Sequence, residues 1–129
     1  MANAIMPGKP PSTILLVDDD PLILELGQEL LEHLGYRVET ASDAVPALEV
    51  FQRQGADLVI MDYRLPGMDG YRLLQELQAL DAGVRVLVAT GHLSPREVTR
   101  LWAGGVRGII YKPFRLEELQ RQLEAVLVS

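Results

Sequence analysis

Apolar residues gather in five short runs along the chain, and stretches with helical periodicity separate these runs. The runs are mostly continuous rather than alternating, as expected for strands that are covered on both faces. We therefore predict five buried strands, at Thr13–Val17, Arg37–Thr40, Leu58–Met61, Val84–Ala89 and Gly108–Tyr111.

Each run is followed by helix signals. Asp20 precedes a proline at the first helical position, and apolar residues then recur at every fourth position until Gly35 ends the helix. A capping box from Ser94 to Glu97 opens a later helix, which Gly104-Gly105 closes. The apolar residues that mark the first, second, third and fifth helices are Leu22, Leu26, Leu30 and Leu34; Ala47, Leu48 and Phe51; Leu73, Leu74 and Leu77; and Leu116, Leu119, Leu123 and Val126.

The predicted order is a strand followed by a helix, five times over. Strand-helix-strand units cross over right-handedly, so this order predicts an α/β fold with a doubly wound five-stranded parallel sheet and helices on both faces. We expect one domain over residues 12–129. Residues 1–11 contain three prolines and a glycine, and we expect them to form a short flexible leader.

Composition narrows the class of protein. The chain has 129 residues and a formal net charge of −6, so direct nucleic-acid binding is not expected. It contains no cysteine, which excludes disulfides and thiolate metal sites and fits a cytoplasmic location. No apolar run approaches the roughly 20 residues of a membrane span, so we expect no membrane association.

Reactive side chains follow four of the five predicted strands. Asp18 and Asp19 follow the first strand, Asp62 the third, Thr90 the fourth and Lys112 the fifth. In open α/β sheets, ligands bind beyond the carboxyl ends of the strands. We therefore expect these five side chains to meet at one edge of the sheet.

Three carboxylates that lie together repel one another, and a hard divalent cation relieves that repulsion. Mg²⁺ favours oxygen ligands, typically carboxylates together with waters and phosphate oxygens. A carboxylate can also attack phosphorus to form an acyl phosphate, and it needs no general base because it is already ionised. Mg²⁺, Lys112 and Thr90 would each neutralise or bond an oxygen of the transferring group. The sequence thus favours phosphoryl chemistry.

Four motifs resemble those of the response-regulator receiver domain of two-component signalling, over essentially the whole ordered length. They are VDDD at Asp18–Asp20, DLVIMDYRLPGMDG around Asp62, VLVATG with Thr90, and YKPF with Lys112. All four occur in order, each at a predicted strand end. The resemblance implies a flavodoxin-like fold with strand order 2-1-3-4-5.

The resemblance also implies roles for the residues. Asp62 would be the phosphoacceptor, taking a phosphoryl group from the phosphohistidine of a histidine kinase. Asp19 would ligate Mg²⁺ directly and Asp18 would help to hold it. Asp62 and the backbone carbonyl of Arg64 would complete the metal's protein ligands.

The remaining implied roles lie on the last two strands. Thr90 would bond a phosphoryl oxygen, Lys112 would pair with the phosphoryl group, and the Lys112-Pro113 peptide would be cis. Receivers commonly carry Tyr or Phe three residues before the lysine, and here the residue is Ile109. We do not expect Tyr111 to replace that aromatic switch, so output would use Thr90, the loop after it and the helix after Ser94.

Two positions near the predicted site are candidates for setting the lifetime of the phosphoryl group. Arg64 lies two residues after Asp62, and we hypothesise that its guanidinium pairs with phosphoryl oxygens and slows hydrolysis. The alternative is a solvated surface arginine. His92 is interpreted as an exposed loop residue, His33 as a helix-end residue and Trp102 as a core residue.

Four other aspartates have structural interpretations. Asp20, Asp43 and Asp69 are predicted helix caps, with Ser42 as the alternative to Asp43 for the second helix. Asp57 is interpreted as a turn residue before the third strand.

The expected partners follow from the resemblance: a sensor histidine kinase or phosphotransfer protein, and an unknown downstream protein. A phosphorylation-dependent homodimer stays open. The protein would be no separate enzyme, since it would catalyse only its own phosphorylation and dephosphorylation. The chain ends after the last helix, so it would be a stand-alone receiver or one cut from a hybrid kinase or larger regulator.

Two alternative functions stay open. A haloacid-dehalogenase-like Mg²⁺ phosphatase also uses Asp, Thr or Ser, and Lys, and Asp18-x-Asp20 imitates its nucleophile motif. However, Pro21 starts a helix at once and leaves no room for that family's excursion after the first strand. The second alternative is a pseudo-receiver that binds a partner without being phosphorylated.

Overall fold

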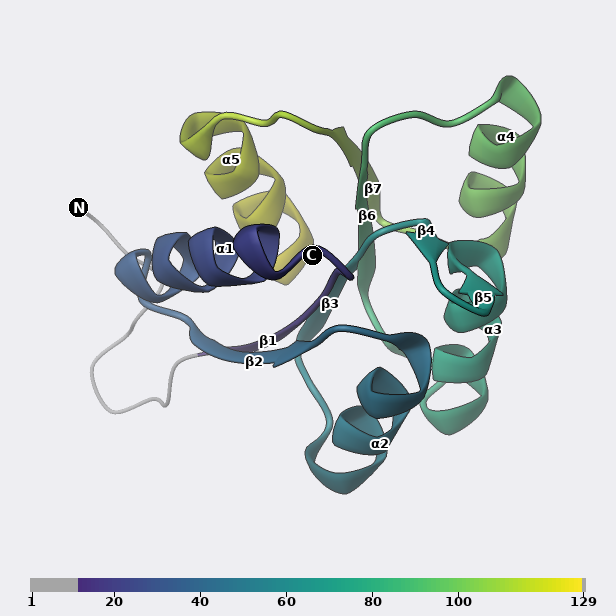
Figure 1. Ribbon diagram of the computed structural model, residues 1–129, viewed down its shortest axis with the longest axis horizontal. Coiled ribbons are helices and arrows are strands. Elements are labelled where there is room, and N and C mark those ends of the chain that lie inside the picture. The colour runs from purple at the N-terminus through teal and green to yellow at the C-terminus, as the bar shows by residue number, and fades with distance from the viewer. Residues whose placement is uncertain (1–11, 129) are drawn as a thin grey trace.

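The computed structural model describes residues 12–128 (Figure 1), and the predicted leader lies outside the described residues. The order of elements is β1 (Thr13–Val17), α1 (Pro21–His33), β2 (Arg37–Ala41), α2 (Ala44–Gln54), β3 (Leu58–Met61), β4 (Arg64–Leu65), β5 (Met68–Asp69), α3 (Gly70–Leu80), β6 (Val86–Thr90), α4 (Pro95–Gly104), β7 (Gly108–Tyr111) and α5 (Leu116–Leu127).

The main sheet has the order β2-β1-β3-β6-β7, and every pair of neighbouring strands is parallel. When only these five strands are counted, the order is 2-1-3-4-5, which confirms the predicted fold. The order reverses between β1 and β3, so the carboxyl ends of these two strands flank the point at which α/β sheets bind ligands.

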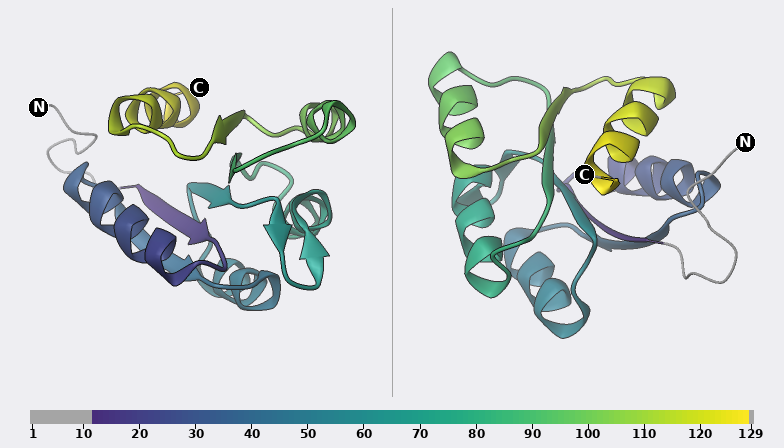
Figure 2. Two further views of the ribbon diagram at one scale, coloured as in Figure 1. Left: turned by 45° about the horizontal axis from the view of Figure 1, so that its top comes forward. Right: turned by 180° about the vertical axis from the view of Figure 1, so that it is seen from behind.

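Helices cover both faces of the sheet (Figure 2), and each face has its own apolar core. Leu15, Val59 and Val88 point to the face covered by α2, α3 and α4. Ile14, Leu16 and Ile60 point to the face covered by α1 and α5. Because successive strand residues alternate between two covered faces, the strands appear in the sequence as continuous apolar runs.

The leucines that mark α1 in the sequence are not its most buried residues. Leu22 and Leu26 are 59% and 48% exposed, whereas Gly27 and Leu31 are buried against the sheet. A Cβ at Gly27 would lie 2.6 Å from Leu16 Cδ2, so an added side chain there would force Leu16 to move. The row of leucines lies on one flank of a wide apolar face, and the glycine marks its contact line.

Two strands have bounds that differ from the prediction. The strand predicted at Val84–Ala89 is β6, which begins at Val86 and ends at Thr90. Val84 instead closes a turn, because its N–H donates to the Asp81 carbonyl at 3.1 Å. β2 extends to Ala41, whose carbonyl accepts from Asp18 N–H at 3.1 Å. Both strands therefore continue up to the predicted site.

Two further features of α3 and α4 were not expected. The RLPGMDG segment forms a small antiparallel hairpin, β4-β5, before α3, where no strand was predicted. Trp102 on α4 is 51% exposed, so its assignment to the core is wrong. No helix among the described residues has both the length and the apolarity to cross a membrane.

Candidate functional site

Four elements bring the predicted residues to one edge of the sheet. Asp62 N–H donates to the Val17 carbonyl at 3.0 Å, so the backbone after β3 stays in register with the end of β1. In the same way, Lys112 N–H donates to the Thr90 carbonyl at 2.8 Å and fixes the end of β7 beside β6. The backbone hydrogen bonds of the sheet thus position Asp62, Thr90 and Lys112 independently of any contact between their side chains.

The Lys112 ammonium lies between two carboxylates. Its Nζ donates to Asp18 Oδ2 and to Asp62 Oδ2, the latter at 3.0 Å. Burial alone would lower the pKa of Lys112, but the hydrogen bonds and charges of Asp18 and Asp62 outweigh it, so the pKa is raised. Lys112 therefore stays a cation at this edge of the sheet, and we call the three side chains the lysine cluster.

The carboxylates suit a hard cation. Asp18, Asp19 and Asp62 each offer an oxygen, and these oxygens lie within 4.8 Å of one another. Asp18 and Asp62 are buried, and Asp19 is exposed at the mouth of the site. An all-oxygen set with an open side fits Mg²⁺, which keeps several waters and binds through one or two carboxylates.

A buried hydroxyl points to a missing partner at the same place. Thr90 is 1% exposed, and its Oγ1 is the one buried side-chain oxygen or nitrogen without a hydrogen-bond partner among the described residues. Buried hydroxyls are rarely left unpaired, because an unmade hydrogen bond is costly. An oxygen-rich group bound at the strand ends would supply that partner.

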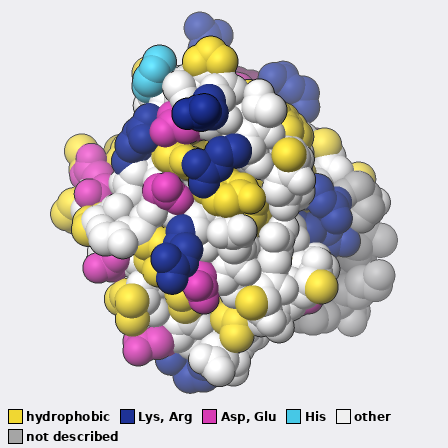
Figure 3. Space-filling view, turned by 90° about the vertical axis from the view of Figure 1, so that its right-hand side faces the viewer, with side chains coloured by type: hydrophobic (Ala, Val, Ile, Leu, Met, Phe, Trp, Pro, Cys, Tyr) yellow, Lys and Arg dark blue, Asp and Glu magenta, His cyan; other side chains and the backbone are white. Residues whose placement is uncertain are grey.

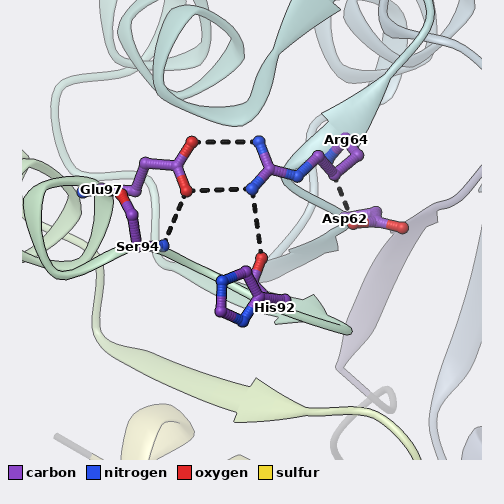
Figure 4. Close-up of polar contacts among 5 residues, drawn as sticks. All are labelled: Asp62, Arg64, His92, Ser94 and Glu97. Carbon is purple, nitrogen blue, oxygen red and sulfur yellow. Dashed lines mark hydrogen bonds and ion pairs between the residues drawn. The ribbon is translucent and has the colours of Figure 1, made fainter.

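Arg64 connects the loop after Asp62 with α4 (Figure 4). Its backbone N–H donates to Asp62 Oδ1 at 3.1 Å, while its guanidinium binds the two oxygens of Glu97 at 3.0 and 2.9 Å. Nη2 also donates to the His92 carbonyl at 3.4 Å. We call the ion pair the Arg64–Glu97 bridge. Sequence reasoning missed it, because Glu97 was interpreted only as part of the capping box.

The bridge shifts the pKa values of both partners. The hydrogen bond from Arg64, with a further bond from the Ser94 backbone, lowers the pKa of Glu97 from 4.5 to about 2. The hydrogen bond to Glu97 raises the pKa of Arg64. Both groups are therefore charged over the whole physiological range.

The remaining candidates lie where their structural interpretations placed them. Asp20, Asp43 and Asp69 accept bonds from helix N-terminal amides, and Asp57 accepts from Thr13 N–H.

The exposed face around α3 and α4, seen in Figure 3, alternates basic and acidic side chains with apolar ones between them. The residues described on that side therefore form no continuous basic patch.

Two features implied by the receiver resemblance can be placed in the structure. The Lys112-Pro113 peptide is cis, as predicted. Ile109 is half-buried on β7 and packs against the core under α4, while Tyr111 is 47% exposed. No aromatic side chain therefore occupies the position of the usual switch.

Comparison with known proteins shows the family. The model of the response regulator receiver domain matches residues 14–124. The sensor histidine kinase AruS of Pseudomonas aeruginosa is 38% identical over 120 residues, which are 90% of this chain and 12% of that protein. The probable transcriptional regulatory protein TcrX of Mycobacterium tuberculosis is 35% identical over 118 residues, which are 91% of this chain and 50% of that protein.

Solved structures agree with this assignment. A CheY-like receiver domain from Methanospirillum hungatei superposes with a TM-score of 0.88 at 30% identity, covering 92% of this chain and 94% of that one. The receiver domain of a sensor histidine kinase from Pseudomonas aeruginosa PAO1 superposes with a TM-score of 0.83 at 32% identity, covering 92% and 99%. That structure has a magnesium ion coordinated in the active-site cleft.

The chain therefore belongs to the response regulator receiver domain family, the phosphoacceptor modules of two-component signalling. It spans about an eighth of several of the sensor kinases it matches and about half of the regulator TcrX. The comparisons give no support to the haloacid-dehalogenase alternative.

Proposed function

We propose that Asp62 accepts a phosphoryl group from a phosphohistidine of a sensor histidine kinase or phosphotransfer protein, with Mg²⁺ held by Asp18, Asp19, Asp62 and the Arg64 carbonyl. The observation that carries this proposal is the lysine cluster. A charged lysine and a second carboxylate lie beside Asp62, and an unpaired buried hydroxyl ends the neighbouring strand β6.

The side chains divide the work of the transfer. A carboxylate oxygen of Asp62 forms a bond to phosphorus, and the donor imidazole nitrogen leaves with the electron pair of the broken P–N bond. Lys112 is already beside that carboxylate and pairs with the incoming phosphoryl oxygens. Thr90 Oγ1 donates to another phosphoryl oxygen and so gains its missing partner. Bound Mg²⁺ supplies charge neutralisation for the carboxylates and the phosphoryl group.

An apolar groove beside the site favours docking of the donor protein there. A pocket of about 460 Å³ opens next to Lys112 and is lined by Ile23, Leu26, Gly27, Leu30, Pro113 and Phe114. Leu26, on this lining, is 48% exposed. A Leu26→Glu variant should take phosphoryl more slowly from a phosphorylated histidine phosphotransfer protein, yet react with acetyl phosphate at the wild-type rate.

Labelling from a small donor tests the proposal without a kinase. With radiolabelled acetyl phosphate and Mg²⁺, the wild type should take up label that Asp62→Asn does not. Asp57→Asn is a matched control, because Asp57 is a carboxylate at the other end of the sheet, and it should be labelled like the wild type. EDTA should abolish uptake in the wild type and in Asp57→Asn.

Two other outcomes would contradict the proposal. Label that persists in Asp62→Asn and maps to Asp18 would point to the phosphatase chemistry instead. A wild type that takes up no label from acetyl phosphate or phosphoramidate would leave a non-phosphorylated binding module. On the proposed function, the chain catalyses only its own phosphorylation and dephosphorylation.

A further inference from the structure

The Glu97 carboxylate has two tasks at once. Oε1 accepts from Ser94 N–H at 2.9 Å and so completes the capping box of α4, while Glu97 N–H receives its cap from Ser94 Oγ at 3.1 Å. The same carboxylate holds the Arg64 guanidinium in a bidentate pair. The first turn of α4 is thus tied to the loop that begins at Asp62.

The guanidinium has one counter-charge in the bridge, and the Arg64 backbone lies beside a second carboxylate, that of Asp62. The Arg64 side chain is 54% exposed, and its backbone N–H is bonded to the Asp62 carboxylate. A phosphoryl group on Asp62 would bring about −1.5 to −2 charges and three acceptor oxygens to this place. Guanidinium groups bind phosphate oxygens in the same forked geometry that they use for carboxylates. A phosphoryl group therefore offers Arg64 the stronger partner.

We propose that Glu97 is a positioning residue of the phosphorylated site: it holds the Arg64 guanidinium in the bridge, and a phosphoryl group on Asp62 competes with Glu97 for it. This inference rests on the proposed phosphorylation of Asp62. It refines the hypothesis that Arg64 pairs with phosphoryl oxygens, because the structure shows which residue that pairing must displace.

Release of the bridge reaches α4 by two contacts. Arg64 gives up its bidentate hold on the first turn of α4 and also its bond to the His92 carbonyl in the loop after Thr90. That loop joins the unpaired Thr90 hydroxyl to Ser94. These contacts therefore couple the site to α4. They do so without an aromatic switch residue, because Ile109 occupies that position.

Reciprocity turns the competition into a binding measurement. If a phosphoryl mimic weakens the bridge, then weakening the bridge must strengthen binding of the mimic by the same factor. Exposed ion pairs are weakly held, so the expected factor is about two- to fivefold.

The experiment measures the affinity of beryllofluoride at saturating Mg²⁺ by ¹⁹F NMR, in the full chain. Glu97→Gln removes the charge of the bridge, yet its amide oxygen can still accept from Ser94 N–H, so the capping box survives. This variant should bind beryllofluoride about two- to fivefold more tightly than the wild type. Arg64→Ala should bind more weakly, and the double variant should equal Arg64→Ala.

Two matched controls separate positioning from a structural role. Glu76→Gln breaks the exposed Arg72–Glu76 pair on α3, which has no link to the site, and should leave the affinity unchanged. Ser94→Ala breaks the other half of the capping box and keeps the bridge, so it should also bind like the wild type.

The outcomes are distinguishable. A gain in affinity that persists when Glu97→Gln is combined with Arg64→Ala would overturn the inference, as would a Glu97→Gln variant that binds like the wild type. Either result leaves the proposed function standing if the wild type still binds beryllofluoride and takes up label on Asp62. If the wild type does neither, the proposed function and this inference both fall.

Discussion

The lysine cluster and the Arg64–Glu97 bridge are two ion-pair groups on neighbouring loops, and they differ in burial. In the cluster, the side chains of Lys112, Asp18 and Asp62 are 18%, 4% and 11% exposed. In the bridge, Arg64 and Glu97 are 54% and 21% exposed. Charges in the cluster have little water to replace a lost partner, whereas charges in the bridge have water close at hand.

This difference in burial implies different roles for the two ion-pair groups. Breaking a buried pair strands an uncompensated charge, so the cluster is held firmly and suits a fixed binding site. An exposed pair contributes little to stability, so it can exchange partners at low cost. We infer that the cluster builds the site and that the bridge reports on its occupancy.

The largest expected effect comes from removing the cation of the cluster. Lys112→Met keeps a side chain of similar length but leaves Asp18 and Asp62 buried without a counter-charge. In EDTA, its free energy of unfolding, measured by urea denaturation, should be lower than that of the wild type by an amount near the lower end of about 3–5 kcal/mol. Added Mg²⁺ should restore part of the loss. If Lys112→Met were as stable as the wild type in EDTA, the ion pairs of the cluster would contribute no more to stability than the exposed bridge does.

A smaller effect is expected from Mg²⁺ itself. At a concentration 100 times its Kd, the ion should stabilise the wild type by about 2.7 kcal/mol. Asp19→Asn removes an exposed ligand that makes no bond to Lys112, and an affinity loss of about tenfold would reduce this gain to about 1.4 kcal/mol. In EDTA the two proteins should be equally stable or the variant slightly more so. Equal stabilisation of both proteins by Mg²⁺ would show that Asp19 is not a ligand of the ion.

The smallest effect concerns the bridge and its pH dependence. The pKa of Glu97 is lowered from 4.5 to about 2, so the stability that its charge contributes is complete above 4.5 and is lost as the pH falls toward 2. The difference in urea midpoint between the wild type and Glu97→Gln should therefore shrink across this window. A difference that stays constant through the window would mean that Glu97 has no such partner in solution. In an Arg64→Ala background the difference should be smaller from the outset.

The lysine cluster could be predicted from the sequence because the sheet determines it. Asp18, Asp62 and Lys112 each follow an apolar run, and parallel strands bring their carboxyl ends to one edge. Backbone register then leaves each side chain little choice of position.

The bridge could not be predicted in this way. Glu97 lies 33 residues from Arg64, and their contact depends on the path of the loop after Thr90 and on two long, exposed side chains. The capping box was the only sequence signal, and it explains Glu97 without Arg64. The buried face of α1 was missed for a related reason, because Gly27 contributes no apolar atoms and yet marks the contact with Leu16.

We infer that Asp62 is the modifiable carboxylate of a magnesium site at the carboxyl edge of the sheet. A crystal structure of the protein with Mg²⁺ and beryllofluoride tests it most directly. We expect beryllium bonded to one Asp62 oxygen, Lys112 and Thr90 Oγ1 in contact with fluorides, and Mg²⁺ on Asp18, Asp19, Asp62 and the Arg64 carbonyl. Beryllium on Asp18, or Mg²⁺ away from these carboxylates, would contradict it.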